Sequence, residues 1–183
     1  LRFDYYGTGD SPGNFEEGDL EIWADDIRAA SEFALAETGA EKLCLLGLRL
    51  GGTLALVCES DHLVLWQPMM DPGTYLKANA RRQALRHKLI DADGGNAPLQ
   101  EIDGYPISEQ LTQSMNEIRP EIKHDSCLLV QISHTEKVSA EYSPWHARAE
   151  FAALRMEPFW NRMGRVEVLP LIETTTNWTS ARG

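Results

Sequence analysis

Residues 42–52 read Lys-Leu-Cys-Leu-Leu-Gly-Leu-Arg-Leu-Gly-Gly, and this stretch decides the fold. Residues 42–48 form a continuous apolar run of strand length. A strand that is apolar throughout is typical of a parallel sheet that is covered on both faces. Glycines and a small-residue helical segment, 53–57, follow directly. The stretch therefore predicts a buried strand, a sharp turn and a helix, which is a building unit of α/β proteins.

Further strands and helices are predicted on both sides of this stretch. Segments 62–66 and 127–132 repeat the buried-strand pattern, and an aromatic-rich strand over 1–6 precedes a Gly-rich loop at 7–13. Segment 149–156 fits either a helix continued from Pro144 or the last strand, and we favour the strand. Helical spacing is seen at 22–34, with Asp19 as its N-cap and Gly39 at its end, and also at 77–88, 107–118 and 166–178.

Strands that alternate with helices over short connections predict a mostly parallel α/β sheet. The pattern differs at about 72–125, where two helical segments flank a Gly-rich loop at 91–96. We interpret this part as a helical cap inserted between two strands of a single domain spanning 1–183. The chain opens directly on a strand and has no initiator Met, so we expect the N-terminal part of the domain to be missing.

Composition excludes several classes of partner. The formal net charge of −11 disfavours binding to nucleic acid and to anionic membrane surfaces. No apolar stretch approaches the ~20 residues of a membrane span. Cys44, Cys58 and Cys127 lie in or beside apolar runs, which predicts buried thiols in a reducing compartment and a cytoplasmic location. No spacing of metal ligands and no cofactor motif is present, so neither a metal nor a cofactor is expected.

The segment Gly47-Leu48-Arg49-Leu50-Gly51-Gly52 has the context of a nucleophile elbow, a turn that presents one residue above a sheet. The usual pattern is G-x-S-x-G, and here Arg49 stands at the nucleophile position. A guanidinium group is always protonated and has no lone pair with which to attack a carbonyl. Arg49 therefore cannot act as a serine-type nucleophile.

Three motifs together carry a resemblance to a known family. Residues 2–11, Arg-Phe-Asp-Tyr-Tyr-Gly-Thr-Gly-Asp-Ser, resemble the D-x-x-G-x-G-x-S strand and loop of α/β-hydrolases. With the elbow and the strand end Leu65-Trp66-Gln67-Pro68, the chain is similar to serine-aminopeptidase-like hydrolases, in particular the exosortase-associated hydrolases of bacteria. Pro158-Phe159-Trp160 fits that subgroup too. The resemblance is strong over residues 1–76 and implies an α/β-hydrolase fold related to ester, peptide and thioester hydrolases.

The resemblance also indicates which site residues are present. It places the triad acid at Glu136, after the strand at 127–132. We expect substrate contacts at Arg49, Leu50 and Trp66, of which Trp66 has packing or a pocket wall as its alternative. The family histidine follows the last strand, where this chain has Glu157-Pro158-Phe159-Trp160, so the base position is unfilled. His134 and His146 are weak substitutes for that base. The loop that supplies the oxyanion donor would precede Leu1.

Three hypotheses about function follow. The first is an inactive or non-classical hydrolase that binds a small acyl or anionic ligand, with Arg49 as an anion clamp at a helix N-terminus. The second is an active hydrolase with another catalytic set, such as Glu136 with a histidine. The third is an interaction module that docks through the cap. Arg49 has a structural alternative as the ion-pair partner of Asp4 or Glu136.

An unpaired sheet edge would favour a homo-oligomer.

Overall fold

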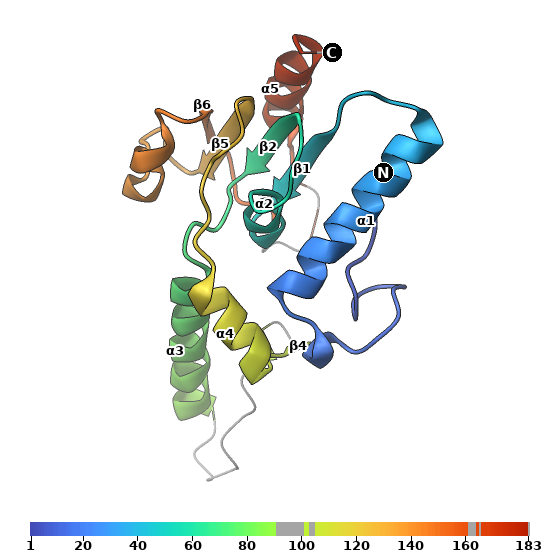
Figure 1. Ribbon diagram of the computed structural model, residues 1–183. Coiled ribbons are helices and arrows are strands. Elements are labelled where there is room, and N and C mark those ends of the chain that lie inside the picture. Colours follow the sequence, from blue (N-terminus) through green and yellow to red (C-terminus); the bar gives the residue numbers. More distant parts are fainter. Residues whose placement is uncertain (91–100, 103–104, 161–163, 165, 183) are drawn as a thin grey trace. The chain divides into compact units, whose positions relative to one another are not determined.

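The computed structural model describes residues 1–90, 101–102, 105–160, 164 and 166–182 (Figure 1). The chain divides into two compact units. The first comprises Leu1–Ala34 and Asp71–Arg119, and the second comprises Leu35–Met70 and Pro120–Gly183.

The second unit contains a four-stranded sheet in the order β1-β2-β5-β6. Its strands are β1 (Cys44–Leu48), β2 (His62–Trp66), β5 (Cys127–Ser133) and β6 (Glu150–Arg155). Every pair of neighbours in this sheet is parallel. The predicted α/β class with a mostly parallel sheet is confirmed, and so is the choice of a strand over a helix for β6.

Helices cover both faces of this sheet. On one face, Leu63, Leu65 and Leu129 pack with Ala55 of α2 (Leu50–Ala55) and with Tyr142 of the 3-10 helix η2 (Ala140–Trp145). On the other face, Val64, Val130 and Ile132 pack against Leu171 and Trp178 of α5 (Leu169–Ser180). The period-2 alternation of β2 and β5 therefore divides the core into two layers.

The first unit is mainly helical. It contains η1 (Phe15–Glu17), most of α1 (Leu20–Thr38), α3 (Pro72–Ile90), α4 (Glu109–Glu117) and the strand pair β3 (Glu101–Ile102) and β4 (Tyr105–Pro106). Along the chain, α3, β3, β4 and α4 lie between β2 and β5, at the position of the predicted insertion. Predicted loop residues 91–96 lie outside the described residues.

Polar contacts position both ends of α1. The Asp19 carboxylate accepts hydrogen bonds from the backbone amides of Glu21 and Ile22, both at 2.9 Å, and so caps the helix as predicted. The side chain of Gln110, on α4, donates to the same carboxylate. At the other end, Gly39 has φ +64° and donates its N–H to the carbonyl of Leu35, as expected of a glycine that ends a helix.

Three expectations about the strands and helices are wrong. Residues 1–6 form no strand, because the carbonyl of Tyr5 accepts from Thr8 and the amide of Tyr6 donates to Asp26 instead of to a neighbouring strand. The helix after the elbow starts at Leu50 and ends at Ala55, not at 53–57. The last helix starts at Leu169.

Strand β1 is less covered than its apolar sequence predicts. It lies at the end of the strand order and pairs only with β2 among the described strands. Leu46 is 49% exposed, and Cys44 is exposed whereas Cys58 and Cys127 are buried. The prediction of three buried thiols is thus wrong for Cys44, because this residue lies on the same face of β1 as the exposed Leu46.

Candidate functional site

Arg49 lies between the end of β1 and the start of α2, at the carboxyl edge of the sheet. Its backbone angles are φ 54° and ψ −118°, a region that side-chain-bearing residues rarely adopt. The amide of Arg49 donates to the carbonyl of Trp66 at 3.0 Å. Its carbonyl accepts from the amides of Gly52, Thr53 and Met69 at 3.1 to 3.3 Å. These bonds hold the strained conformation in place.

Glycines allow the turn to be this tight. A Cβ on Gly47 would lie 2.4 Å from the carbonyl oxygen of Gly51, and one on Gly52 would lie 3.0 Å from the carbonyl oxygen of Gly47. Backbone therefore packs directly on backbone across the turn. This geometry is that of a nucleophile elbow, a strained strand-to-helix turn that exposes one side chain above the sheet.

The side chain of Arg49 makes two contacts that sequence reasoning missed. Its Nη1 donates to the carbonyl of Gln67 at 3.4 Å. Its guanidinium carbon lies 5.1 Å from the centroid of the Trp160 ring, within the range of a cation–π interaction. Glu136 is exposed. The structural alternative for Arg49, an ion pair with Asp4 or Glu136, stays a prediction.

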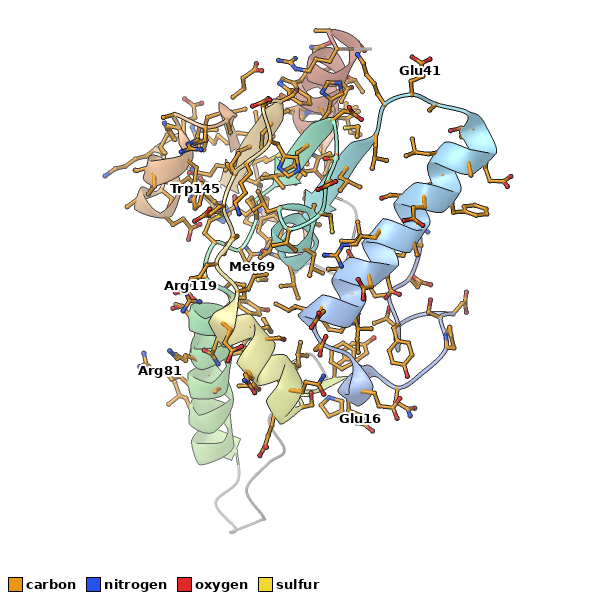
Figure 2. All side chains as sticks on the ribbon, viewed as in Figure 1. Glu16, Glu41, Met69, Arg81, Arg119 and Trp145 are labelled. Carbon is orange, nitrogen blue, oxygen red and sulfur yellow. The ribbon has the colours of Figure 1, made fainter. Side chains whose placement is uncertain are left out.

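The loop after β2 is hydrogen-bonded to the elbow and to the neighbouring strand β5. Gln67 also has a positive φ, 47°, and its amide donates to the carbonyl of Val130 at 2.8 Å. Its side-chain oxygen accepts from the amide of Ile132, so Gln67 joins the ends of β2 and β5. Thr53 Oγ1 donates to the carbonyl of Met69, which is labelled in Figure 2, at 2.7 Å. This bond connects α2 to the same loop.

A buried tyrosine also holds the loop after β2 through a hydrogen bond. Tyr142 is 0% exposed, and its hydroxyl donates to the carbonyl of Pro68 at 2.9 Å. Burial and the neighbouring Glu141 raise the pKa of Tyr142 far above its usual range, while the positive charge of Arg49 opposes that rise. The phenol therefore stays neutral at physiological pH and acts as a hydrogen-bond donor to the loop.

The segment after β5 contains the predicted acid, Glu136. Both Glu136 and His134 are exposed. The loop backbone is held by buried Gln131, whose side chain donates to the carbonyl of Lys137 at 2.9 Å and accepts from the amide of Ser139 at 2.7 Å. The position of Glu136 after β5 matches the prediction, whereas its role stays a prediction.

The segment after β6 contains no histidine. It starts at Met156, whose amide donates to the carbonyl of Ser133 at 3.0 Å, and it brings Trp160 to Arg49. His146 lies on the other side of β6 in the sequence and stacks on Phe151, with ring centroids 4.2 Å apart. The unfilled base position stays a prediction.

The other two predicted substrate contacts lie beside the elbow. Leu50 is the first residue of α2, and in a nucleophile elbow the amide after the nucleophile contributes to the oxyanion hole. Trp66 is the last residue of β2, and its indole Nε1 donates to Thr175 Oγ1 of α5 at 3.0 Å. Trp66 is thus fixed against α5 at the same edge of the sheet as Arg49.

Several solved structures are similar to this chain. Est1E from Butyrivibrio proteoclasticus, solved with ferulic acid bound, superposes with a TM-score of 0.70 at 18% identity, covering 97% of this chain and 74% of Est1E. The chain has the α/β-hydrolase fold. A putative hydrolase from Agrobacterium vitis S4 gives a TM-score of 0.55 at 16% identity, over 99% of this chain and 74% of that one.

A third α/β-hydrolase neighbour is the esterase EaEST from Exiguobacterium antarcticum, with a TM-score of 0.51 at 18% identity, over 98% of this chain and 79% of EaEST. No protein-family model matches the sequence, and no curated protein matches it. A strained strand-to-helix turn, such as the one at Arg49, is a feature of this fold.

The described residues contain neither a candidate membrane span nor a candidate metal cluster. No helix there is long and apolar enough to span a bilayer. No group of three or more histidine, cysteine, aspartate or glutamate side chains gathers there in a way that fits a metal ion.

Proposed function

We propose that this chain is an α/β-hydrolase-fold protein that binds a small acyl or anionic ligand at the carboxyl edge of its sheet and does not use a serine nucleophile. One observation carries the proposal. Arg49 occupies the elbow, with φ 54° and ψ −118°, and a guanidinium has no atom that attacks a carbonyl. The chain thus keeps the backbone turn of a hydrolase elbow but lacks a nucleophilic side chain at that turn.

The chemistry of Arg49 supports an anionic ligand. A guanidinium carries five N–H donors in one plane and matches a carboxylate in a bidentate geometry. The Trp160 ring contacts the group at 5.1 Å through a cation–π interaction, which does not consume an N–H donor. Helix α2 spans only Leu50–Ala55, so its dipole adds little to this attraction.

Aromatic side chains near Arg49 favour a flat acid as the ligand. Phe159 packs edge-on against Trp160, with ring centroids 5.5 Å apart, and both rings are partly buried against the α5 face of the sheet. Trp66, also partly buried against that face, ends β2 at the same edge. Est1E was solved with ferulic acid, an aromatic carboxylic acid, so ferulate is the first ligand to test.

Two finer assignments belong to the same proposal. The motifs at 2–11 and 158–160 support a place among the exosortase-associated hydrolases of bacteria, and the segment at about 72–125 would act as a cap of a single domain. A cytoplasmic location stays a prediction.

Isothermal titration calorimetry with ferulate tests the proposal. Charge-assisted hydrogen bonds contribute about 1.5–3 kcal/mol, so Arg49→Gln is expected to weaken binding by roughly 10- to 150-fold. Arg148→Gln is the matched control, because Arg148 is exposed between η2 and β6 and the substitution removes the same charge. If Arg49→Gln and Arg148→Gln bind ferulate as tightly as the unmodified protein, Arg49 is a structural residue and the anion clamp is wrong.

Turnover separates the proposal from an active hydrolase with another catalytic set. We expect no hydrolysis of p-nitrophenyl esters above the background rate. Turnover that is lost in Glu136→Gln and in His134→Gln would instead support the second hypothesis, in which these residues activate water.

A further inference from the structure

Helix α3 concentrates positive charge in a chain whose formal net charge is −11. Its sequence, Pro72–Ile90, contains five lysine and arginine residues and no aspartate or glutamate. Lys77, Arg81 and Arg82 are exposed, and the ion pairs formed among the described residues include none of them. Figure 2 shows Arg81 extending from α3 on the side away from α4. The exposed face of α3 therefore carries a net positive charge.

The contacts that fix α3 within the first unit lie on its buried side and at its N-terminus. Leu76 is 3% exposed, and a Cβ on Gly73 would lie 2.5 Å from the side-chain oxygen of Asn116 on α4. The carboxylate of Asp71, just before the helix, accepts hydrogen bonds from the amide and the hydroxyl of Thr74 at 2.8 and 2.7 Å. The exposed side chains of Arg81 and Arg82 are thus not part of this packing.

Helix α1 has the opposite charge. Its sequence contains five aspartate and glutamate residues and one arginine. Glu21, Asp25 and Glu32 are exposed and lie in one row, because residues four and seven positions apart face the same side of a helix. Arg28 pairs with Asp25 in this row, which leaves the row with a net negative charge.

The two charged faces match in length and in composition. At 1.5 Å per residue, the row from Lys77 to Leu85 is about 12 Å long and the row from Glu21 to Glu32 about 16 Å. Each face also presents a large apolar side chain, since Leu85 is 59% exposed and Phe33 is 57% exposed. Protein interfaces typically combine apolar side chains at the centre with charged side chains at the rim.

We propose that the protein forms a symmetric dimer in which α3 of one copy docks on α1 of a second copy. Arg81 and Arg82 would face Glu21 and Glu32 of the other helix. A twofold axis produces this contact twice, because each copy contributes both faces. A single exposed ion pair adds little, so the association would depend on several charges acting together.

Charge complementarity favours a second copy over other occupants of α3. Anionic lipid or nucleic acid would match α3 alone, and the net charge of −11 repels both. A second copy supplies the acidic face of α1 and, in a symmetric dimer, covers both faces at once. Both rows are exposed within one copy, so neither is covered by the other there.

Sedimentation equilibrium of the unmodified protein is the first test. We expect a monomer–dimer equilibrium at low ionic strength. Salt at about 0.5 M reduces the range of electrostatic attraction to about 4 Å, so the dissociation constant of the dimer is expected to rise about tenfold or more.

Reversal of the charge on each face tests which surfaces meet. Arg81→Glu with Arg82→Glu makes both faces acidic, and Glu21→Lys with Glu32→Lys makes both faces basic. Each double variant is expected to be monomeric, with a dissociation constant raised about 100-fold or more by like charges. An equimolar mixture of the two is expected to form a heterodimer, because both of its contacts then join opposite charges.

The control is Arg148→Glu with Arg155→Glu, which changes the net charge as much as the α3 variant does, at exposed positions of the second unit. It is expected to dimerise like the unmodified protein, and circular dichroism checks that every variant is folded. A monomeric unmodified protein, or folded charge variants that stay monomeric when mixed, would overturn the proposal. So would a dimer that survives both reversals, which would point to the edge of β1, or binding of α3 to phosphatidylserine vesicles in place of self-association.

Discussion

The Cα of Gly47 lies so close to Gly51 that a Cβ added to Gly47 would be 2.4 Å from the carbonyl oxygen of Gly51. The same Cβ would be 2.6 Å from the Cα of Gly52. This backbone contact between the end of β1 and the first turn of α2 fixes the conformation of Arg49, which lies between them. The requirement for glycine there is steric, and it is separate from any catalytic role.

Gly47→Ala is therefore expected to destabilise the protein strongly. Overpacking by one methyl group costs about 1–3 kcal/mol, and here the obstructing atoms belong to the backbone, which favours the upper end of that range. The control is Gly39→Ala, where a Cβ meets nothing within 4 Å but the φ of +64° costs about 1 kcal/mol. Urea unfolding measures both free energies. Equal losses for the two variants would contradict the backbone contact at Gly47.

A fluorophosphonate probe is expected to label no serine of this protein. Arg49 stands at the elbow, and the first serine to suspect, Ser11, donates its hydroxyl to the carbonyl of Asp4 at 2.6 Å. Mass spectrometry after incubation checks this. Stoichiometric labelling of any serine would show that a hydroxyl is activated and would remove the basis of the proposed function.

Arg49→Ser is expected to gain no strong esterase activity, although it restores the usual elbow residue. Loss of one triad member already costs several orders of magnitude in rate, and no histidine follows β6 at 156–160. Turnover of a p-nitrophenyl ester is compared with that of Arg49→Ala, which removes the guanidinium without adding a hydroxyl. Fast turnover by the serine variant alone would prove that a base is present.

Thr175→Val is expected to destabilise the protein by about 1–2 kcal/mol. The substitution keeps the shape of the side chain but removes the acceptor of the Trp66 indole N–H, which is bonded at 3.0 Å. Thr176→Val on the exposed side of α5 is the control, with an expected change within about 0.5 kcal/mol. A neutral Thr175→Val would mean that the indole finds another partner, and that α5 is not seated through Trp66.

Stability is expected to fall at alkaline pH because of Cys127. Burial raises the pKa of the Cys127 thiol from its ordinary 9.0 to about 12. Between these values the unfolded chain loses the proton and the folded protein keeps it, so the thiol's contribution is full below pH 9 and declines as pH rises. The slope is about 1.4 kcal/mol per pH unit.

Urea unfolding at pH 8 and pH 10 measures this decline. Cys127→Ala is the reference, because it retains the other alkaline titrations, including that of Tyr142. The unmodified protein is expected to lose about 1 kcal/mol more than the variant over this interval. Parallel losses in both proteins would show that Cys127 titrates normally.

Sequence alone determined the strands and the turn between them. The apolar runs at 42–48, 62–66 and 127–132 each became a strand of one parallel sheet, and the two inner strands, β2 and β5, are covered on both faces as a continuous apolar run predicts. The glycines around Arg49 predicted the tight turn, because only backbone without a side chain can approach so closely. These are local properties, which depend on residues that are neighbours in the chain.

Tertiary structure alone decided what surrounds Arg49. Trp160 reaches the guanidinium from beyond β6, more than a hundred residues along the chain, and Gln67 does so from the end of β2. The aromatic-rich segment 1–6 forms no strand, because a strand needs a neighbour that accepts and donates its backbone bonds. The local pattern of apolar residues predicts the secondary structure that a segment favours. Contacts between distant segments depend instead on how the strands and helices pack together.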